Sequence, residues 1–207
     1  SYHKFPEIIS KLKDGERNII ETSFEASDKF KSIASLAGKS KPSAFVTIQE
    51  GCDKFCTFCV VPYTRGKEVS RSQNDILSEI RESAKKGVKE VILLGQNVNS
   101  YNFEGISFSS LIYSIAEIDE IKRIRFMTSH PRDMTDELIN AFGVIPKLMP
   151  FLHLPVQSGS NRILKSMNRG HVVEEYVEII NKLRLKRKDI CFSSDFIVGY
   201  PGETDKD

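Results

Sequence analysis

The fold of this chain is decided by one stretch, Gly51-Cys52-Asp53-Lys54-Phe55-Cys56-Thr57-Phe58-Cys59, in which three cysteines have the spacing C-x3-C-x2-C. The stretch directly follows an apolar run at residues 44–49. Three thiolates so close together favour a soft metal centre. A four-iron cluster normally takes four cysteines, so a site with three leaves one iron able to bind a substrate or cofactor. We therefore expect a reactive iron-sulfur cluster held by Cys52, Cys56 and Cys59.

The same spacing is also compatible with a structural zinc site completed by Cys191 or by a histidine. Cys191 lies far from the other three, at the start of an apolar segment. We expect it to be a buried free cysteine that packs as a small hydrophobic residue. His153 and His171 stay open as ligands, so spacing alone does not decide between the cluster and zinc.

Outside this loop, strand-like and helix-like segments alternate from residue 43 to the end of the chain. Apolar runs predict five strands, at residues 44–49, 90–94, 123–127, 148–154 and 190–198. Helical periodicity predicts four helices between them, at residues 72–87, 108–118, 135–142 and 176–185. The alternation predicts a parallel sheet, and the apolar strands fit a sheet that is buried on both faces.

The loops after the five predicted strands are rich in small and polar residues. They are the cysteine loop, Gly95-Gln96-Asn97, Thr128-Ser129-His130-Pro131, Pro155-Val156-Gln157-Ser158-Gly159-Ser160 and Gly199-Tyr200-Pro201-Gly202-Glu203. A doubly wound sheet concentrates its site at one switch point, whereas a barrel uses all the loops at the carboxyl ends of its strands. We therefore expect an α/β fold of the partial (β/α)6 barrel type, with five βα units and a parallel sheet.

Composition and charge narrow the class of protein. The chain has 207 residues, of which 40% are hydrophobic and 28% charged, as in ordinary globular proteins. A net charge of +2 indicates no basic face, so composition predicts no nucleic-acid binder. No stretch approaches the roughly 20 apolar residues of a membrane span. The cysteines form no disulfide framework, which favours a reducing, cytoplasmic compartment.

The motifs also resemble those of a known family. The spacing C-x3-C-x-aromatic-C, with Phe58 as the aromatic residue, resembles the signature of radical S-adenosylmethionine (SAM) enzymes. Further motifs resemble the methylthiotransferases among them: residues 46–66, LGQNVNSY at 94–101, HLPVQSGS at 153–160 and SDFIVGYPGET at 194–204. The resemblance implies a radical SAM core at residues 43–207, incomplete at its C-terminus. Residues 1–42, with a helical pattern at 5–13, would be the tail of an N-terminal methylthiotransferase domain and a linker.

The resemblance implies roles for particular residues. Cys52, Cys56 and Cys59 would bind three irons, and the methionine end of SAM would chelate the fourth before cleavage to a 5'-deoxyadenosyl radical. SAM would be contacted at its amino group by Gly95, Gln96 and Asn97, at its ribose or carboxylate by Gln157, Ser158 and Ser160, and at its adenine by Ile197, Val198 and Gly199. The general motif ends in Glu where this chain has Asn97. Arg65 and Arg71 would pair with the SAM carboxylate or with RNA phosphate, or would simply be solvated.

The implied activity is insertion of a methylthio group at C2 of N6-isopentenyladenosine next to the anticodon of tRNA. The implied partners are tRNA, through the full-length protein, and an external electron donor such as flavodoxin or ferredoxin; the protein would be a monomer. No cysteine precedes Cys52, so a second cluster would belong to a missing N-terminal domain, and we expect this chain alone not to be fully active. Two alternatives are a sister methylthiotransferase acting on threonylcarbamoyladenosine or a ribosomal protein, and a non-catalytic metal-binding remnant of the enzyme.

Overall fold

The computed structural model describes residues 4–20, 30 and 42–207. It has two compact units, Ser1–Leu36 and Ala37–Asp207. In the first unit, helix α1 spans Phe5–Lys13 and has a proline in its first turn, which confirms the helical pattern. The predicted linker lies outside the described residues, and the domain boundary expected at residue 42 stays a prediction.

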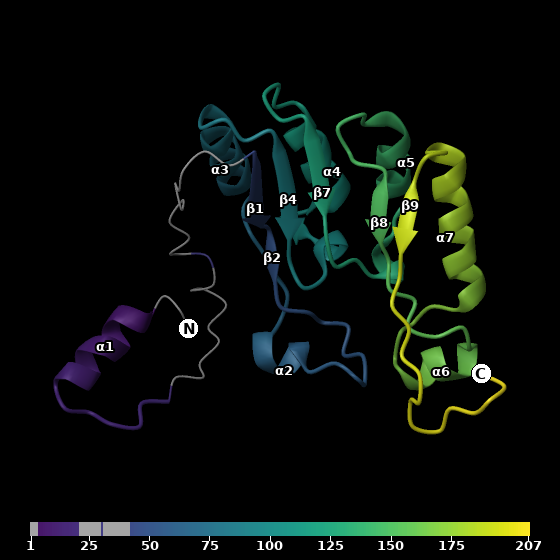
Figure 1. Cartoon of the computed structure of the whole chain (residues 1–207), viewed down its shortest axis with the longest axis horizontal. Coiled ribbons are helices and arrows are strands. Elements are labelled where there is room, and N and C mark those ends of the chain that lie inside the picture. The colour runs from purple at the N-terminus through teal and green to yellow at the C-terminus, as the bar shows by residue number, and fades with distance from the viewer. Residues whose placement is uncertain (1–3, 21–29, 31–41) are drawn as a thin grey trace. The chain divides into compact units, whose positions relative to one another are not determined.

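The second unit is built on five parallel strands that lie side by side in chain order (Figure 1). The strands are β1 (Ser43–Thr47), β4 (Glu90–Leu94), β7 (Arg123–Phe126), β8 (Phe151–His153) and β9 (Cys191–Ser193). The first three form one sheet in the order β1-β4-β7, and β8 pairs with β9. A parallel bridge between Ile124 and Leu148 joins the two groups. The order never reverses, as it would in a doubly wound sheet, which confirms the partial barrel.

Helices connect these strands where periodicity predicted them. They are α3 (Gln73–Lys85), α4 (Phe108–Ala116), α5 (Asp136–Val144) and α7 (Val173–Lys186). Ser107 and Thr135 cap α4 and α5, each side chain accepting from a backbone N–H of the first turn. Ser72 stands at the N-cap position of α3, but its side chain makes no capping hydrogen bond.

The core lies on one face of the strands only. Alternate residues such as Val46, Val91 and Leu152 are fully buried, as are many apolar residues of the helices. The opposite face carries Phe45, which is 65% exposed, and Phe151, which is 40% exposed. The expectation that the strands are buried on both faces is therefore wrong, because nothing within residues 42–207 covers the second face.

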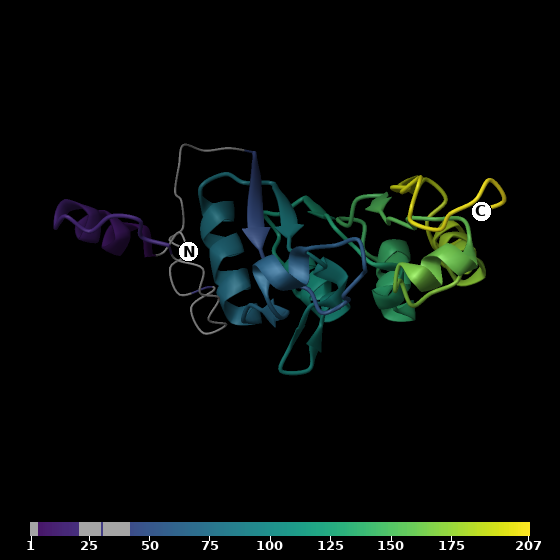
Figure 2. The same cartoon turned by 90° about the horizontal axis from the view of Figure 1, so that it is seen from below.

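Short elements that periodicity did not predict lie mostly in the loops at the carboxyl ends of the strands. They are α2 (Val61–Arg65), α6 (Asn161–Ser166), the β2 (Gln49–Glu50) and β3 (Val69–Ser70) pair, the β5 (Asn102–Phe103) and β6 (Ile106–Ser107) hairpin, and 3-10 turns at Val98–Ser100 and Pro131–Asp133. The β5–β6 hairpin projects from the unit as a teal loop in Figure 2. The fifth strand ends at Ser193, earlier than expected, and the chain continues in turns.

Two basic residues near the end of α7 form ion pairs. Lys182 pairs with Asp136 and Glu178, and Arg187 pairs with Asp189. These pairs are typical of a helix end at the protein surface, where cations complement the helix dipole. Among the helices at 4–20 and 42–207, none is long and apolar enough to cross a membrane.

Candidate functional site at the carboxyl ends of the strands

The cysteine loop begins with a turn that requires glycine. Gly51 has φ +88°, and a Cβ there would lie 2.0 Å from the carbonyl oxygen of Lys67. The backbone N–H of Cys52 donates to Gly66 O at 3.2 Å, and that of Cys59 donates to Cys56 O at 2.9 Å. No disulfide uses these cysteines. The loop therefore folds by its own backbone contacts and leaves three thiols available.

Segments from two later loops hold the cysteine loop from outside. The N–H of Thr57 donates to Met167 O at 3.1 Å, just after α6. Asn168 Nδ2 donates to Phe55 O at 3.0 Å, and the hydroxyls of Thr57 and Tyr200 lie 2.7 Å apart. The loops after β1, β8 and β9 thus meet, as a barrel rim requires.

Strained backbone also gathers at this rim. Six described residues other than glycine have positive φ, and four of them lie here: Phe55, Thr128, Gln157 and Asn168. Thr128 is β-branched, which makes its φ of +64° a true outlier. Such conformations persist only where surrounding contacts enforce them, and they are common at functional sites.

Burial and nearby groups act on the thiol of Cys52. Burial raises the pKa of Cys52 to about 11; a backbone hydrogen bond from Lys54 opposes this, and Glu68, Cys56 and Cys59 raise it further. Deprotonating this thiol therefore needs a strong cationic partner, which a metal centre supplies.

Within the part of the chain that the structure describes, no three His, Cys, Asp or Glu side chains converge on one metal-ion position. Cys191 is exposed, contrary to expectation, because its strand register pairs it with Phe151 on the uncovered face.

The second loop is locked to the cysteine loop through a buried glutamine. Gln49 Oε1 accepts from the N–H groups of Gln96 at 3.0 Å and Asn97 at 3.2 Å, and its Nε2 donates to Gly51 O at 2.7 Å. Gln96 Oε1 in turn accepts from Gly51 N at 2.7 Å. A Cβ at Gly95 would lie 2.7 Å from Gln49 Oε1. These contacts fix the position of Gly95, Gln96 and Asn97 beside the cysteines.

Two groups in this region were not predicted from the sequence. Asp133 accepts from Asn97 Nδ2 at 2.7 Å. Arg169, only 5% exposed, directs its guanidinium Nη1 to Cys56 Sγ at 3.5 Å and Nη2 to Pro155 O at 2.6 Å. Each of the two residues contacts residues that are far away in the sequence. Neither lies in a sequence motif that would have identified it.

Buried polar atoms without partners mark the same region. Among the described residues these atoms are Asn97 Oδ1, Arg169 Nε, His130 Nε2 and His171 Nε2. The rings of His130 and His171 lie 6.0 Å apart, edge to face. Burial lowers the pKa of His130 to about 2, and the charges of Arg169 and Lys54 lower it further. Buried polar groups are normally hydrogen-bonded, so unpartnered ones indicate a place where a ligand can supply partners.

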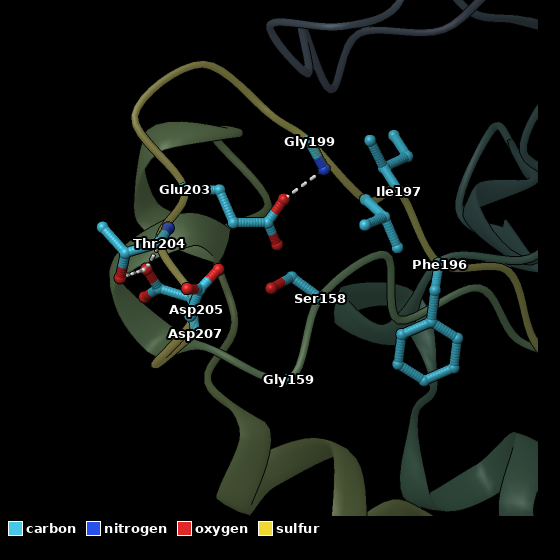
Figure 3. Close-up of a pocket in the computed structure, with 10 residues that line it drawn as sticks. Ser158, Gly159, Phe196, Ile197, Gly199, Glu203, Thr204, Asp205 and Asp207 are labelled. Carbon is cyan, nitrogen blue, oxygen red and sulfur yellow. Dashed lines mark hydrogen bonds between the residues drawn. The ribbon is translucent and has the colours of Figure 1, made fainter.

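Several residues expected at the SAM site line one pocket of about 570 Å³ (Figure 3). Ser158, Ile197, Val198 and Gly199 lie on its wall, together with acidic residues from the end of the chain. Figure 3 shows the Glu203 carboxylate reaching back to the N–H of Gly199. The pocket is open and has an apolar side and an acidic side.

Two further expected residues do not line this pocket. Gln157 pairs through its backbone, accepting from Ile197 N at 2.9 Å. Ser160 caps α6, accepting from Ile163 N at 3.4 Å, and donates to Asp207 Oδ1 at 2.7 Å. Its hydroxyl is thus used within the fold.

The arginines near the cysteine loop are held by ion pairs. Arg71 is buried, pairs with Glu79 and donates to Thr47 O at 3.3 Å, so it is neither solvated nor open to a ligand. Arg65 is half exposed and lies 3.8 Å from Glu50. The structure therefore gives Arg71 a structural role.

His153 is likewise engaged within the fold. Its Nδ1 lies 2.7 Å from Ser193 Oγ, and its Nε2 lies 3.3 Å from Asp195 Oδ2. These neighbours belong to β9 and the segment after it, so the ring ties β8 to the last strand.

Curated relatives align over the whole chain. Proteins named tRNA-2-methylthio-N(6)-dimethylallyladenosine synthase are 53% identical over 207 residues in Cereibacter sphaeroides, 53% over 212 in Rickettsia akari and 55% over 216 in Maricaulis maris. Each alignment covers 100% of this chain and 47% or 48% of the relative. The chain thus spans about half the length of the curated relatives it matches.

Solved structures share the fold at low identity. The radical SAM methyltransferase TsrM from Kitasatospora setae, with tryptophan and a SAM analogue bound, has a TM-score of 0.65 and 14% identity, covering 81% of this chain and 32% of its own. The cobalamin-dependent radical SAM enzyme OxsB has a TM-score of 0.60 and 16% identity, covering 74% of this chain and 23% of its own. The model of the radical SAM superfamily matches residues 46–207. The chain therefore belongs to the radical SAM superfamily.

Proposed function

We propose that this chain is the radical SAM core of a tRNA methylthiotransferase, which inserts a methylthio group at C2 of N6-isopentenyladenosine next to the anticodon. The observation that carries the proposal is the 53% identity over all 207 residues to the Cereibacter sphaeroides synthase. The three cysteines and the loops around them are the chemical basis for it.

In this proposal Cys52, Cys56 and Cys59 hold a [4Fe-4S] cluster. Three free thiols on one loop suit a cluster in which each thiolate binds its own iron. A TsrM structure contains such a cluster. Arg169 beside Cys56 would offset the negative charge of the thiolates. When bound, the cluster and SAM supply one-electron chemistry that activates an inert C–H bond, which side chains cannot do.

The unpartnered polar atoms fit the amino-acid end of SAM. That end carries an ammonium group, which donates, and a carboxylate, which accepts. Asn97 Oδ1 is a buried acceptor without a partner, and Arg169 Nε is a buried donor without one. The pair would bind the two charged groups of one α-amino acid, with Gly95 and Gln96 forming the supporting backbone.

The open pocket would take the adenosine end. Ile197, Val198 and Gly199 offer apolar surface and backbone to the adenine, and Ser158 would hydrogen-bond the ribose. Contacts from Gln157 and Ser160 stay predictions. The carboxylates on the acidic side accept hydrogen bonds and so suit ribose hydroxyl groups.

We further propose that the full-length protein containing this chain binds tRNA and carries a second cluster for sulfur insertion. It would receive electrons from a donor such as flavodoxin or ferredoxin, and would act as a monomer in the cytoplasm. The tRNA, the second cluster and the electron donor are each required by the proposed reaction.

Anaerobic reconstitution of the full-length protein with iron and sulfide tests the cluster. Cys56→Ala should remove about four irons per chain. Cys191→Ala is the matched control, since that thiol is exposed on β9, and it should retain wild-type iron content. Wild-type iron content in Cys56→Ala would contradict the assignment, and zinc alone in anaerobically purified protein would favour a zinc site.

Mass analysis of tRNA nucleosides tests the substrate. Cells that lack their own enzyme should gain 2-methylthio-N6-isopentenyladenosine when the full-length protein is supplied, and should not gain it with Cys56→Ala. Appearance of a methylthiolated threonylcarbamoyladenosine instead would identify the sister activity.

A further inference from the structure

One carboxylate joins three loops of the rim. Asp133 lies in the 3-10 turn after β7, and its Oδ1 accepts from Lys54 Nζ at 2.7 Å, within the cysteine loop. Its Oδ2 accepts from Asn97 Nδ2 at 2.7 Å, in the loop after β4. The Lys54 and Asp133 side chains are only 16% and 18% exposed, and Asn97 is 2% exposed.

This contact fixes which way the amide of Asn97 faces. An ionised carboxylate only accepts hydrogen bonds, so the NH₂ group of the amide must face Asp133. The amide oxygen then faces elsewhere, and Asn97 Oδ1 is a buried acceptor with no partner among the described residues. A flipped amide would set its oxygen against the carboxylate, which is repulsive.

Other contacts already hold these loops together, so the Asn97 to Asp133 bond is not needed for that purpose. Asn99 Nδ2 donates to His130 O at 2.9 Å, and His130 N donates to Asn99 Oδ1 at 2.9 Å. The backbone of Asn97 is held by Gln49, and Ser100 Oγ donates to its carbonyl at 2.8 Å. The Asn97 side chain is therefore available for another task.

We propose that Asp133 is a positioning residue, which orients the Asn97 amide so that Oδ1 accepts a hydrogen bond from the ammonium group of an amino-acid ligand. Lys54 holds the carboxylate in place and balances its charge. The carboxylate also polarises the Asn97 amide and so strengthens the hydrogen bond that Oδ1 accepts from the ligand, because hydrogen bonds in a chain polarise one another. The inference rests on the proposed function, in which that ligand is the amino-acid end of SAM.

Two ligands separate this role from a purely structural one. S-adenosylhomocysteine has the amino-acid end, and 5'-methylthioadenosine lacks it. Calorimetry on the full-length protein with its cluster should show that Asp133→Asn weakens S-adenosylhomocysteine about tenfold, since a charge-assisted hydrogen bond is lost. Binding of 5'-methylthioadenosine should change by less than about twofold. In an Asn97→Ala background, Asp133→Asn should add no further selective loss.

Asp136→Asn is the matched control, because it makes the same chemical change three residues away on an exposed side chain. It should leave both affinities at wild-type values. If Asp133→Asn gives no cooperative thermal melt, Asp133→Glu replaces it. That variant keeps the charge but displaces the acceptor, so it too should weaken S-adenosylhomocysteine selectively.

Equal weakening of both ligands, or unchanged binding of S-adenosylhomocysteine, would overturn the positioning role and leave the proposed function intact. If the wild-type protein binds neither ligand, the SAM site itself is wrong, and the positioning role is wrong with it.

Discussion

The candidate site has two halves that are built differently. The half formed by the cysteine loop and the loop after β4 is tightly packed, and a Cβ at Gly51 or Gly95 would lie within 3 Å of other atoms. The half formed by the loops after β8 and β9 is open, and a Cβ at Gly159 or Gly202 would meet nothing within 4 Å. Glycine allows close approach of the backbone in the first half, whereas in the second half the space beside these glycines is open.

The difference indicates how a ligand would be divided between the halves. In the tight half Asn97 Oδ1 is buried without a partner, and the buried guanidinium of Arg169 contacts this half at Cys56, which suits a charged end that needs exact partners. The open half offers exposed apolar side chains such as Val198, which is 89% exposed. We infer that the tight half is preformed and that the open half is adaptable.

The largest effect should come from Gly51→Ala. The new methyl group would overlap the carbonyl oxygens of Gly66 and Lys67, at a φ that disfavours any side chain. We expect more than about 4 kcal/mol of lost stability, in the exceptional range for one substitution, and loss of the cluster. Urea unfolding and iron analysis measure the two effects. Wild-type iron content would show that the tight half tolerates rearrangement.

Gly95→Ala should have the next largest effect. Its methyl group would press on Gln49, which is fully buried and bonds both loops, so we expect about 2 kcal/mol of lost stability. Because Gln49 also holds Gly51, the damage should reach the cysteine loop and lower iron content as well as SAM affinity. Weaker SAM binding with full iron content would show that the two loops are independent.

Two buried neutral histidines at the rim make the fold sensitive to acid. Burial lowers the pKa of His130 from 6.5 to about 2, and burial also lowers the pKa of His171. Below pH 6.5 the unfolded chain therefore binds protons that the folded chain does not, so stability is complete above this pH and falls below it. His130 alone should cost about 1.4 kcal/mol per pH unit.

Urea unfolding at several pH values between 7.5 and 5.5 measures that slope. His130→Gln is the control, because it removes the titrating group. It should reduce the slope of the unfolding free energy against pH by about 1.4 kcal/mol per pH unit. An unchanged slope in this variant would show that His130 is not the group responsible.

Elements with a strong local signal were predictable from the sequence. The run Glu90–Leu94 is a strand within the bounds expected, because four consecutive apolar residues follow Glu90, between a helix end and a polar loop. Helices α3, α4, α5 and α7 were predicted from the helical periodicity of their apolar residues. The cysteine loop followed from spacing, although only the fold shows which segments support it.

The parts that were missed depend on contacts between distant residues. Helix α6 is too short to show periodicity and is supported by Arg162, which pairs with Asp207. The role of Asp133 depends on its contact with Lys54, which is 79 residues away in the sequence. The role of Arg169 depends on its contact with Cys56, which is 113 residues away. Exposure of Cys191 likewise depended on which face of the strands stayed uncovered.

The smallest effect should come from Gly159→Ala, in the open half. Gly159 has no positive φ, and nothing lies within 4 Å of the position its Cβ would take. The change in the free energy of unfolding should therefore stay within about 0.5 kcal/mol, as at ordinary surface positions. Iron content should be that of the wild type, because Gly159 contacts no part of the cysteine loop in a way a methyl group would disturb. Urea unfolding beside Gly51→Ala gives the comparison directly. A loss of more than about 1 kcal/mol would mean that the open half is packed as closely as the tight one, and the division of the site into a preformed and an adaptable half would fail.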